Sequence, residues 1–301
     1  MASIDQLLTQ AVDLTQLEDF QKVFADDEIK YFSKENYNIP DVVKHFLKST
    51  NKEEPFYIID IASILDQFTL WKTHLPRVHP FYTSKTSFEP KLLSVLDSLG
   101  LGFVISNQFE LEKLLTLQKF PEVIYSSIQK KIKDLQSLKD KNIDLLTVST
   151  TDELPRIKEH FPTARLILQT EISPIGAPSN FITKFPSSQE EIKEILVLGK
   201  SLGLNFIGMT CHINQNNDPS LYHQAISNAK EVFELAKTFG FNFNLLDLRS
   251  TLPGATNSTY KSFLLVADTI NKALSDYFGD KPDLKIIAEL GNFFAVRSAI
   301  L

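Results

Sequence analysis

Eight short apolar segments, each followed by an amphipathic stretch of helical spacing, constrain the fold of this 301-residue chain more than any other feature. Each segment is rich in Val, Ile, Leu and Phe, which is typical of buried strands. The expected strands are Val78–Ser84, Gly102–Ser106, Glu122–Ser126, Ile143–Val148, Arg165–Thr170, Asn205–Thr210, Asn244–Leu248 and Lys285–Glu289. Eight strand–helix units predict a (β/α)8 barrel, and a doubly wound open sheet is the structural alternative.

The segments between the strands have the spacing of helices. In Leu221–Lys237, for example, the apolar residues fall on one helical face. The expected helices are Glu89–Ser98, Gln108–Leu117, Ile128–Asp140, Thr151–His160, Gln189–Leu202, Pro219–Phe239 and Tyr260–Phe278. This pattern assigns residues 78–301 to the barrel.

Two segments precede the barrel. Residues 1–50 are expected to form an N-terminal helical extension. Residues 51–77 are expected to form a lead-in, with a strand at Pro55–Asp60 and a helix at Ile61–Leu75. No repeat or low-complexity tract interrupts this order, so the sequence predicts one large α/β domain with an extension.

Charge and composition exclude several classes of protein. The net charge of −6 argues against nucleic-acid binding, which needs a basic face. Cys211 is the single cysteine, so a disulfide framework and a cysteine-rich metal site are both excluded, and no metal is expected. No apolar run is long enough to span a membrane, and the N-terminus has no basic start before an apolar stretch. A cytoplasmic location is therefore expected.

Several motifs, linked in one order, carry a resemblance to a known family. They cover roughly residues 50 to 301, and the order makes the match specific although each motif alone is weak. The motifs are Glu54–Asp60 (EPFYIID), Leu75–Lys85 (LPRVHPFYTSK), Thr210–His212 (TCH), Ala229–Phe233 (AKEVF) and Ile286–Ala295 (IIAELGNFFA). With these motifs the chain resembles the eukaryotic ornithine decarboxylases, and Tyr277–Pro282 (YFGDKP) is closest to the plant-type members.

The resemblance implies a fold and a reaction. The family has a barrel of the alanine-racemase type that binds pyridoxal 5′-phosphate (PLP), joined to a C-terminal β-domain. Its enzymes are usually homodimers that share active sites across the interface. They convert ornithine to putrescine and carbon dioxide, which is a step of polyamine biosynthesis. The expected partners of this chain are therefore a second copy, or a full-length decarboxylase in a heterodimer, and an amino-acid substrate if the chain is active.

Three residues match positions of the family that contact the cofactor. Lys85 matches the lysine that holds the PLP aldehyde as a Schiff base, Glu289 the acid on the pyridine nitrogen, and His212 the histidine that stacks on the ring. All three follow or end an expected strand, at the rim where such barrels carry their sites. Without the resemblance, each has a structural interpretation: a solvated lysine, a core histidine and an ion-pair member. Cys211, beside His212, is interpreted as a small buried hydrophobe.

The residues expected around the cofactor phosphate differ from the family pattern. Arg249-Ser250-Thr251 stands where the family has three glycines, and the added Cβ atoms restrict φ and crowd the phosphate. Arg249 is a candidate for a compensating cation. Asn292 replaces an arginine that contacts the phosphate. Other differences are Val104, Ser127-Ile128, Gln169 and Asn214-Gln215-Asn216.

The C-terminal β-domain of the family is expected to be missing, either in a short protein or in an incomplete gene model. The strand at Pro55–Asp60 pairs within that domain in the family, so here it would expose an unpaired apolar edge. We therefore expect a partner, a homo-oligomer or poor solubility.

Three functions follow from these observations. The favoured hypothesis is an ornithine-decarboxylase-like protein that is catalytically impaired and acts as a non-catalytic or regulatory paralogue. The second is an active PLP-dependent ornithine or lysine decarboxylase, suggested by Lys85, His212 and Glu289. The third is a one-domain PLP carrier without turnover. The altered phosphate site favours the first over the other two.

Overall fold

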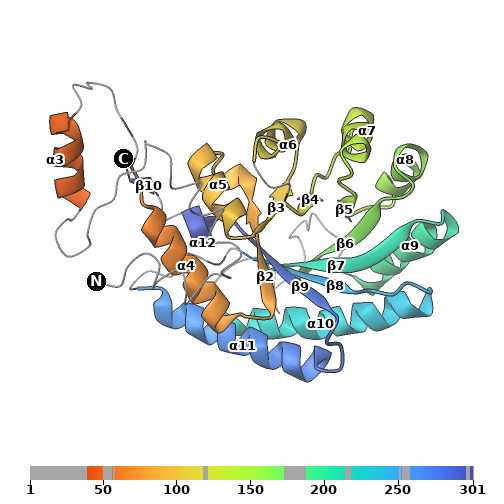
Figure 1. Ribbon diagram of the computed structural model, residues 1–301. Coiled ribbons are helices and arrows are strands. Elements are labelled where there is room, and N and C mark those ends of the chain that lie inside the picture. The colour runs from red at the N-terminus through yellow and green to blue at the C-terminus, as the bar shows by residue number, and fades with distance from the viewer. Residues whose placement is uncertain are drawn as a thin grey trace, which may run out of the picture.

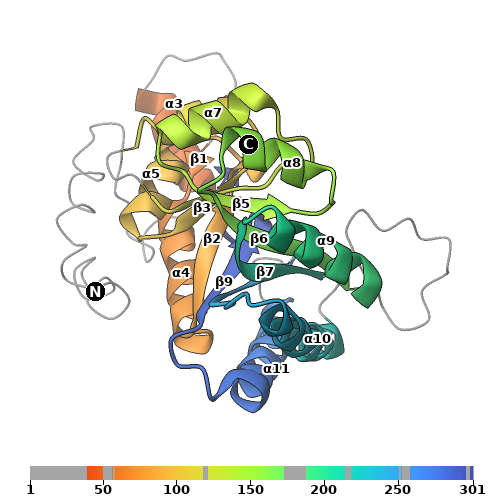
Figure 2. The same ribbon diagram turned by 90° about the vertical axis from the view of Figure 1, so that its right-hand side faces the viewer.

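The computed structural model describes residues 39–49, 56, 58–117, 121–172, 188–213, 218–250, 252, 258–295 and 299–300. In this part of the chain, eight parallel strands close into a barrel, and helices surround it on the outside (Figures 1 and 2). The strands follow one another in chain order from β2 to β9, and β9 pairs with β2 to complete the ring. The (β/α)8 prediction is confirmed, and the open sheet is excluded.

All eight expected strands are present, with ends shifted by a few residues at most. They are β2 (Val78–Thr83), β3 (Gly102–Ile105), β4 (Val123–Tyr125), β5 (Leu145–Val148), β6 (Arg165–Ile172), β7 (Asn205–Ile213), β8 (Leu245–Ser250) and β9 (Lys285–Leu290). β6 and β7 run further toward the carboxyl end than the sequence predicted.

The expected barrel helices are also present. They are α5 (Pro90–Ser98), α6 (Gln108–Leu114), α7 (Ile132–Asp140), α8 (Glu153–His160), α9 (Gln189–Ser201), α10 (Pro219–Thr238) and α11 (Tyr260–Phe278). Several begin at a side chain that accepts from the first turn. The Asn107 amide oxygen accepts from the Glu110 N–H, and Ser188 forms a reciprocal capping box with Glu191. In the described residues, no helix is long and apolar enough to cross a membrane.

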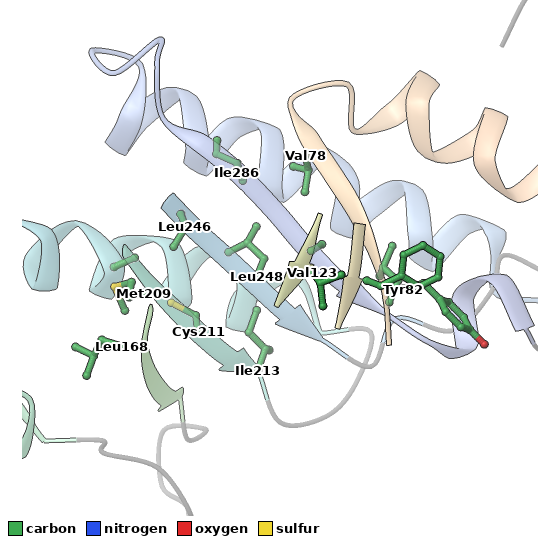
Figure 3. Close-up of a cluster of buried hydrophobic side chains, with 14 of the residues drawn as sticks. Val78, Tyr82, Val123, Leu168, Met209, Cys211, Ile213, Leu246, Leu248 and Ile286 are labelled. Carbon is green, nitrogen blue, oxygen red and sulfur yellow. The ribbon is translucent and has the colours of Figure 1, made fainter. Parts of the chain in front are cut away.

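The strand side chains form two separate apolar layers. The layer inside the barrel takes one residue from each strand: Phe81, Val104, Ile124, Leu145, Ile167, Ile207, Leu245 and Ile287. The residues that alternate with them point outward and pack under the helices; Tyr82 and Leu248 are examples, as are Met209 and Cys211 beyond the register shift of β7 (Figure 3). Alternation of side chains along each strand therefore fills both layers.

The lead-in consists of α3 (Ile39–Ser49), β1 (Ile58–Ile59) and α4 (Ile61–His74). Helix α4 is attached to the barrel through Trp71, which is fully buried and donates from Nε1 to the Val78 carbonyl at 2.7 Å. The Trp71 ring also meets the Phe293 ring in α12 (Asn292–Ala295), with 5.3 Å between the centroids. Residues 1–38, which the sequence assigned to the extension, lie outside the described residues.

The prediction that the strand in Pro55–Asp60 lacks a partner is wrong. β1 pairs antiparallel with β10 (Ala299–Ile300), with Ile58 opposite Ile300 and Ile59 opposite Ala299. The chain returns past β1 after α12, a contact that local sequence patterns do not reveal. Residues 299–300 thus belong to this second, two-stranded sheet, and the barrel itself ends with β9.

Gly208 on β7 permits a close approach of two strand backbones. The pairing of β6 with β7 changes register at Leu166/Ile167, and Gly208 lies opposite Leu245 of β8. A Cβ atom on Gly208 would lie 2.1 Å from the Leu245 carbonyl oxygen. A backbone oxygen in a closed barrel has little freedom to move away, so this position requires glycine.

We expect Gly208→Ala to lower the free energy of unfolding by roughly 1–3 kcal/mol, because the new methyl group must separate β7 from β8. Denaturant unfolding of the purified chain would measure the change. The control is Asn205→Ala on the exposed start of β7, which should change stability by less than about 0.5 kcal/mol. Equal unfolding midpoints for the two variants would contradict this account.

Candidate functional site

A ring of polar side chains lies above the apolar layer inside the barrel. One step further toward the carboxyl end, each strand carries a polar residue or is directly followed by one; on β7 this residue is Thr210, beyond the register shift of that strand. We call this ring the barrel mouth; its residues are Thr83, Ser106, Ser126, Thr147, Gln169, Thr210, Asp247 and Glu289. Hydrogen bonds join neighbours in it, such as Thr147 Oγ1 to Ser126 Oγ at 3.3 Å. The parallel strands thus place their polar positions at one end, where barrels of this fold carry their sites.

The three residues matched to cofactor positions all lie at this end. Lys85 is exposed in the short 3₁₀ turn Ser84–Thr86 that directly follows β2. Glu289 is buried on β9, in register with Phe81 of the neighbouring β2. His212 is half-buried near the end of β7 and lies in register with Arg249 of β8. The geometry is consistent with a shared site, and the role of each residue stays a prediction.

Arg249 extends from β8 into the barrel mouth. Its Nε lies 3.1 Å from Oε2 of Glu289, whose side chain is 1% exposed. Its Nη1 donates to Ser126 Oγ at 3.2 Å. Ser126 follows β4, which is four strands from β8 in a ring of eight, and therefore on the opposite side. The guanidinium group thus spans the mouth from one wall to the other.

Asp247 is the second acid of the mouth and is fully buried. Its Oδ2 accepts from Thr210 Oγ1 at 2.9 Å. Burial, followed by the charge of neighbouring Glu289, raises the pKa of Asp247 well above its ordinary value. We therefore infer that Asp247 is neutral in the folded chain. Its Oδ1 and both carboxylate oxygens of Glu289 are buried without a hydrogen-bond partner among the described residues, and Arg249 is the cation beside Glu289.

Two buried glutamates fix the loops that follow β3 and β5. Glu110 accepts from the Ser106 backbone N–H at 2.7 Å, and Glu153 accepts from the Ser149 N–H at 2.7 Å. Both belong to the same sequence pattern, Ser-x-x-x-Glu-Leu, directly after a strand. We did not identify these residues from the sequence, although this repeated spacing was the signal that could have found them.

Glu153 also pairs with Lys130, a lysine that is 1% exposed. Burial lowers the pKa of Lys130, and the charge of Glu153 opposes that shift. Lys130 Nζ donates to the Ser127 carbonyl at 2.8 Å as well. The pair therefore ties the loop after β4, which carries Ser126, to the start of α8.

Positions where the sequence departs from the family pattern are only partly described. Val104 belongs to the apolar layer, and Gln169 Oε1 accepts from Ser149 Oγ at 3.2 Å. Asn292 is exposed at the start of α12. Asn214–Asn216 and Thr251 lie outside the described residues. Cys211 is buried on the outer face of β7, and burial raises the pKa of its thiol to about 12, in agreement with a small hydrophobe.

Comparisons with known proteins agree with the fold. A family model described as "Pyridoxal-dependent decarboxylase, pyridoxal binding domain" matches residues 61–296. The ornithine decarboxylase of Schizosaccharomyces pombe is 34% identical over 250 residues, which is 82% of this chain and 56% of that protein. Antizyme inhibitor 2 of Xenopus laevis is 29% identical over 254 residues, 84% of this chain and 56% of that protein.

Solved structures of decarboxylases also match the fold of this chain. The arginine decarboxylase of Paramecium bursaria Chlorella virus bound to agmatine matches with a TM-score of 0.79 and 27% identity, over 87% of this chain and 70% of that one. The chain spans about half the length of the curated relatives that it matches.

We expect Asp247→Asn to stabilise the protein at neutral pH. The unfolded chain releases the Asp247 proton near the ordinary pKa of 3.8, whereas the folded chain retains it, so wild-type stability falls as pH rises between the two pKa values. The slope is about 1.4 kcal/mol per pH unit. An asparagine still accepts from Thr210 and has no proton to lose.

Thermal unfolding over a pH series would measure this effect. The advantage of Asp247→Asn should disappear once the pH falls below 3.8, where wild-type Asp247 is protonated in both states. The control is Asp144→Asn, which removes the partner of Arg165 at the opposite end of the barrel and should give no gain. A wild-type midpoint equal to that of Asp247→Asn at neutral pH would show that Asp247 is ionised.

Proposed function

The chain belongs to the family of pyridoxal-dependent decarboxylases, and from this membership we propose that it is a non-catalytic, ornithine-decarboxylase-like member that acts by association with other proteins. Its family is the one that supplies putrescine in polyamine biosynthesis, and the matched domain of that family binds PLP. The proposal concerns what this chain does with that inherited barrel.

Decarboxylation by this family depends on the cofactor. When bound, PLP supplies an electron sink that stabilises the negative charge left after carbon dioxide departs. A protein of the family must hold the aldehyde with a lysine and keep the pyridine nitrogen protonated with an acid. Lys85 and Glu289 occupy the matching strand ends here, and His212 lies two strands from Glu289 in the ring.

The ion pair between Arg249 and Glu289 is the observation that carries the proposal. Glu289 is the carboxylate that would meet the ring nitrogen, but its Oε2 already lies 3.1 Å from Arg249 Nε. The same arginine crosses the mouth to Ser126. In this arrangement the side chains of the mouth do not fit the cofactor ring, which would need both the carboxylate and the space above it.

The relatives are compatible with a role that does not require catalysis. One relative is an ornithine decarboxylase, at 34% identity, whereas another, at 29% identity, is called antizyme inhibitor 2. We propose a homodimer, or a heterodimer with a full-length decarboxylase, as the form in which this chain acts.

An active decarboxylase is the second candidate. Lys85, exposed beside the mouth, favours it, because a free amine at that position is the group that the reaction requires. A PLP carrier without turnover would use the same lysine. Both candidates require that PLP enters the mouth.

We expect the wild-type chain to release no carbon dioxide from carboxyl-labelled ornithine or lysine in the presence of PLP, because Arg249 lies against Glu289 and crosses the mouth. The measurement compares it with a full-length ornithine decarboxylase under the same conditions, after circular dichroism has established that the chain is folded. Release at a rate that Lys85→Ala abolishes would refute the non-catalytic proposal.

We also expect the chain to form a mixed species with a full-length ornithine decarboxylase from the same organism. Sedimentation velocity of each protein alone and of an equimolar mixture would reveal a species that is absent from both single samples. If the mixture sediments as the sum of its components, the proposed heterodimer is wrong. If the chain alone sediments as a monomer, the proposed homodimer is wrong as well.

A further inference from the structure

We infer that Arg249 replaces the cofactor as the counter-cation of Glu289, and that its guanidinium group excludes PLP from the barrel mouth. The inference rests on the proposed function and adds its physical cause. It assigns to one side chain both the neutralisation of Glu289 and the exclusion of the cofactor.

The first argument concerns charge. Glu289 lies at the end of a barrel strand with its side chain 1% exposed, and an ionised carboxylate at such a site needs a positive partner. Asp247 beside it supplies no positive charge. In the part of the chain that the structure describes, the cation in contact with Glu289 is Arg249. The carboxylate is therefore neutralised by the chain's own residue.

The second argument concerns shape. A guanidinium group is planar, delocalised and positive, and it presents N–H donors in its plane. A protonated pyridine ring has the same features where it meets an acid. Arg249 thus offers Glu289 a partner of the same chemical kind, from the position at which the family has a glycine without a side chain.

The third argument concerns position. Arg249 begins on β8, contacts Glu289 on β9 and reaches Ser126 after β4. These strands lie on opposite walls of the ring, so the side chain crosses the space between them. A ring seated against Glu289 would require Arg249 to give up both contacts and leave the mouth.

Two roles of Arg249 predict opposite effects of its removal on PLP binding. If Arg249 served as a cation for the cofactor phosphate, its removal would weaken PLP binding. If Arg249 occupies the place of the ring, its removal permits binding. The experiment uses Arg249→Ala, with Arg165→Ala as the matched control. Arg165 lies on β6 and also pairs with a carboxylate, that of Asp144, but at the opposite end of the barrel.

Each variant of the 301-residue chain is incubated with PLP and reduced with borohydride, and mass spectrometry then locates the modified lysine. We expect Arg249→Ala to carry at least about tenfold more PLP on Lys85 than the wild type, because a competing charge-assisted contact has gone. Arg165→Ala should match the wild type. A folded Arg249→Ala variant without labelling of Lys85 would overturn the exclusion of PLP by Arg249 and leave the proposed function standing. Labelling of Lys85 in the wild type to the level of Arg249→Ala would also overturn the exclusion of PLP, whereas the proposed function is refuted only by carbon dioxide release.

Thermal unfolding without PLP tests the counter-cation. Arg249→Ala should unfold at a lower temperature than the wild type, because Glu289 loses its partner, and added PLP should raise the midpoint of this variant alone. Where Arg249→Ala does not fold, the double variant Arg249→Ala/Glu289→Gln should, because both charges have been removed. An unchanged midpoint for Arg249→Ala, or a double variant less stable than the single one, would show that Arg249 is not the counter-cation.

Discussion

Glu289 is a carboxylate buried at the end of a barrel strand, and the need to neutralise it governs what the barrel mouth is able to hold. Water does not reach the side chain, so the charge must be balanced within the site. Arg249 Nε lies 3.1 Å from Glu289 Oε2 and provides that balance. In a decarboxylase of this family the cofactor ring meets the same need. In this chain Arg249 of β8 is the group that lies against Glu289.

The barrel explains why the matched positions lie together at one end of the strands. Its apolar layer takes one side chain from each strand and sets the register in which the strands meet. Residues at the carboxyl ends are held over this layer whether or not a ligand is present. Lys85, His212 and Glu289 thus remain on one rim, and the fold alone does not decide whether they act.

Buried glutamate side chains hold the loops that follow β3 and β5 at the barrel mouth. Glu110 and Glu153 fold back onto the backbone after β3 and β5, and Lys130 neutralises Glu153 and holds the Ser127 carbonyl. The adjacent residue Ser126 is the one that receives Arg249. The position of the arginine is therefore supported by contacts on two walls of the barrel, as expected for a side chain with one preferred placement.

The sequence by itself determined the strands, the barrel and the end at which Lys85, His212 and Glu289 lie. These features depend on periodicity within short segments, and consecutive βα units leave few ways to connect them. It did not reveal the partner of Arg249, the pairing of β1 with β10, or the pair of Lys130 and Glu153. Those contacts join segments far apart in the chain; Arg249 and Ser126 are separated by 123 positions. Closure of the ring, which brings opposite walls within the reach of one side chain, decided the contact of Arg249 with Ser126; the other contacts depend on how segments distant in the chain pack against one another.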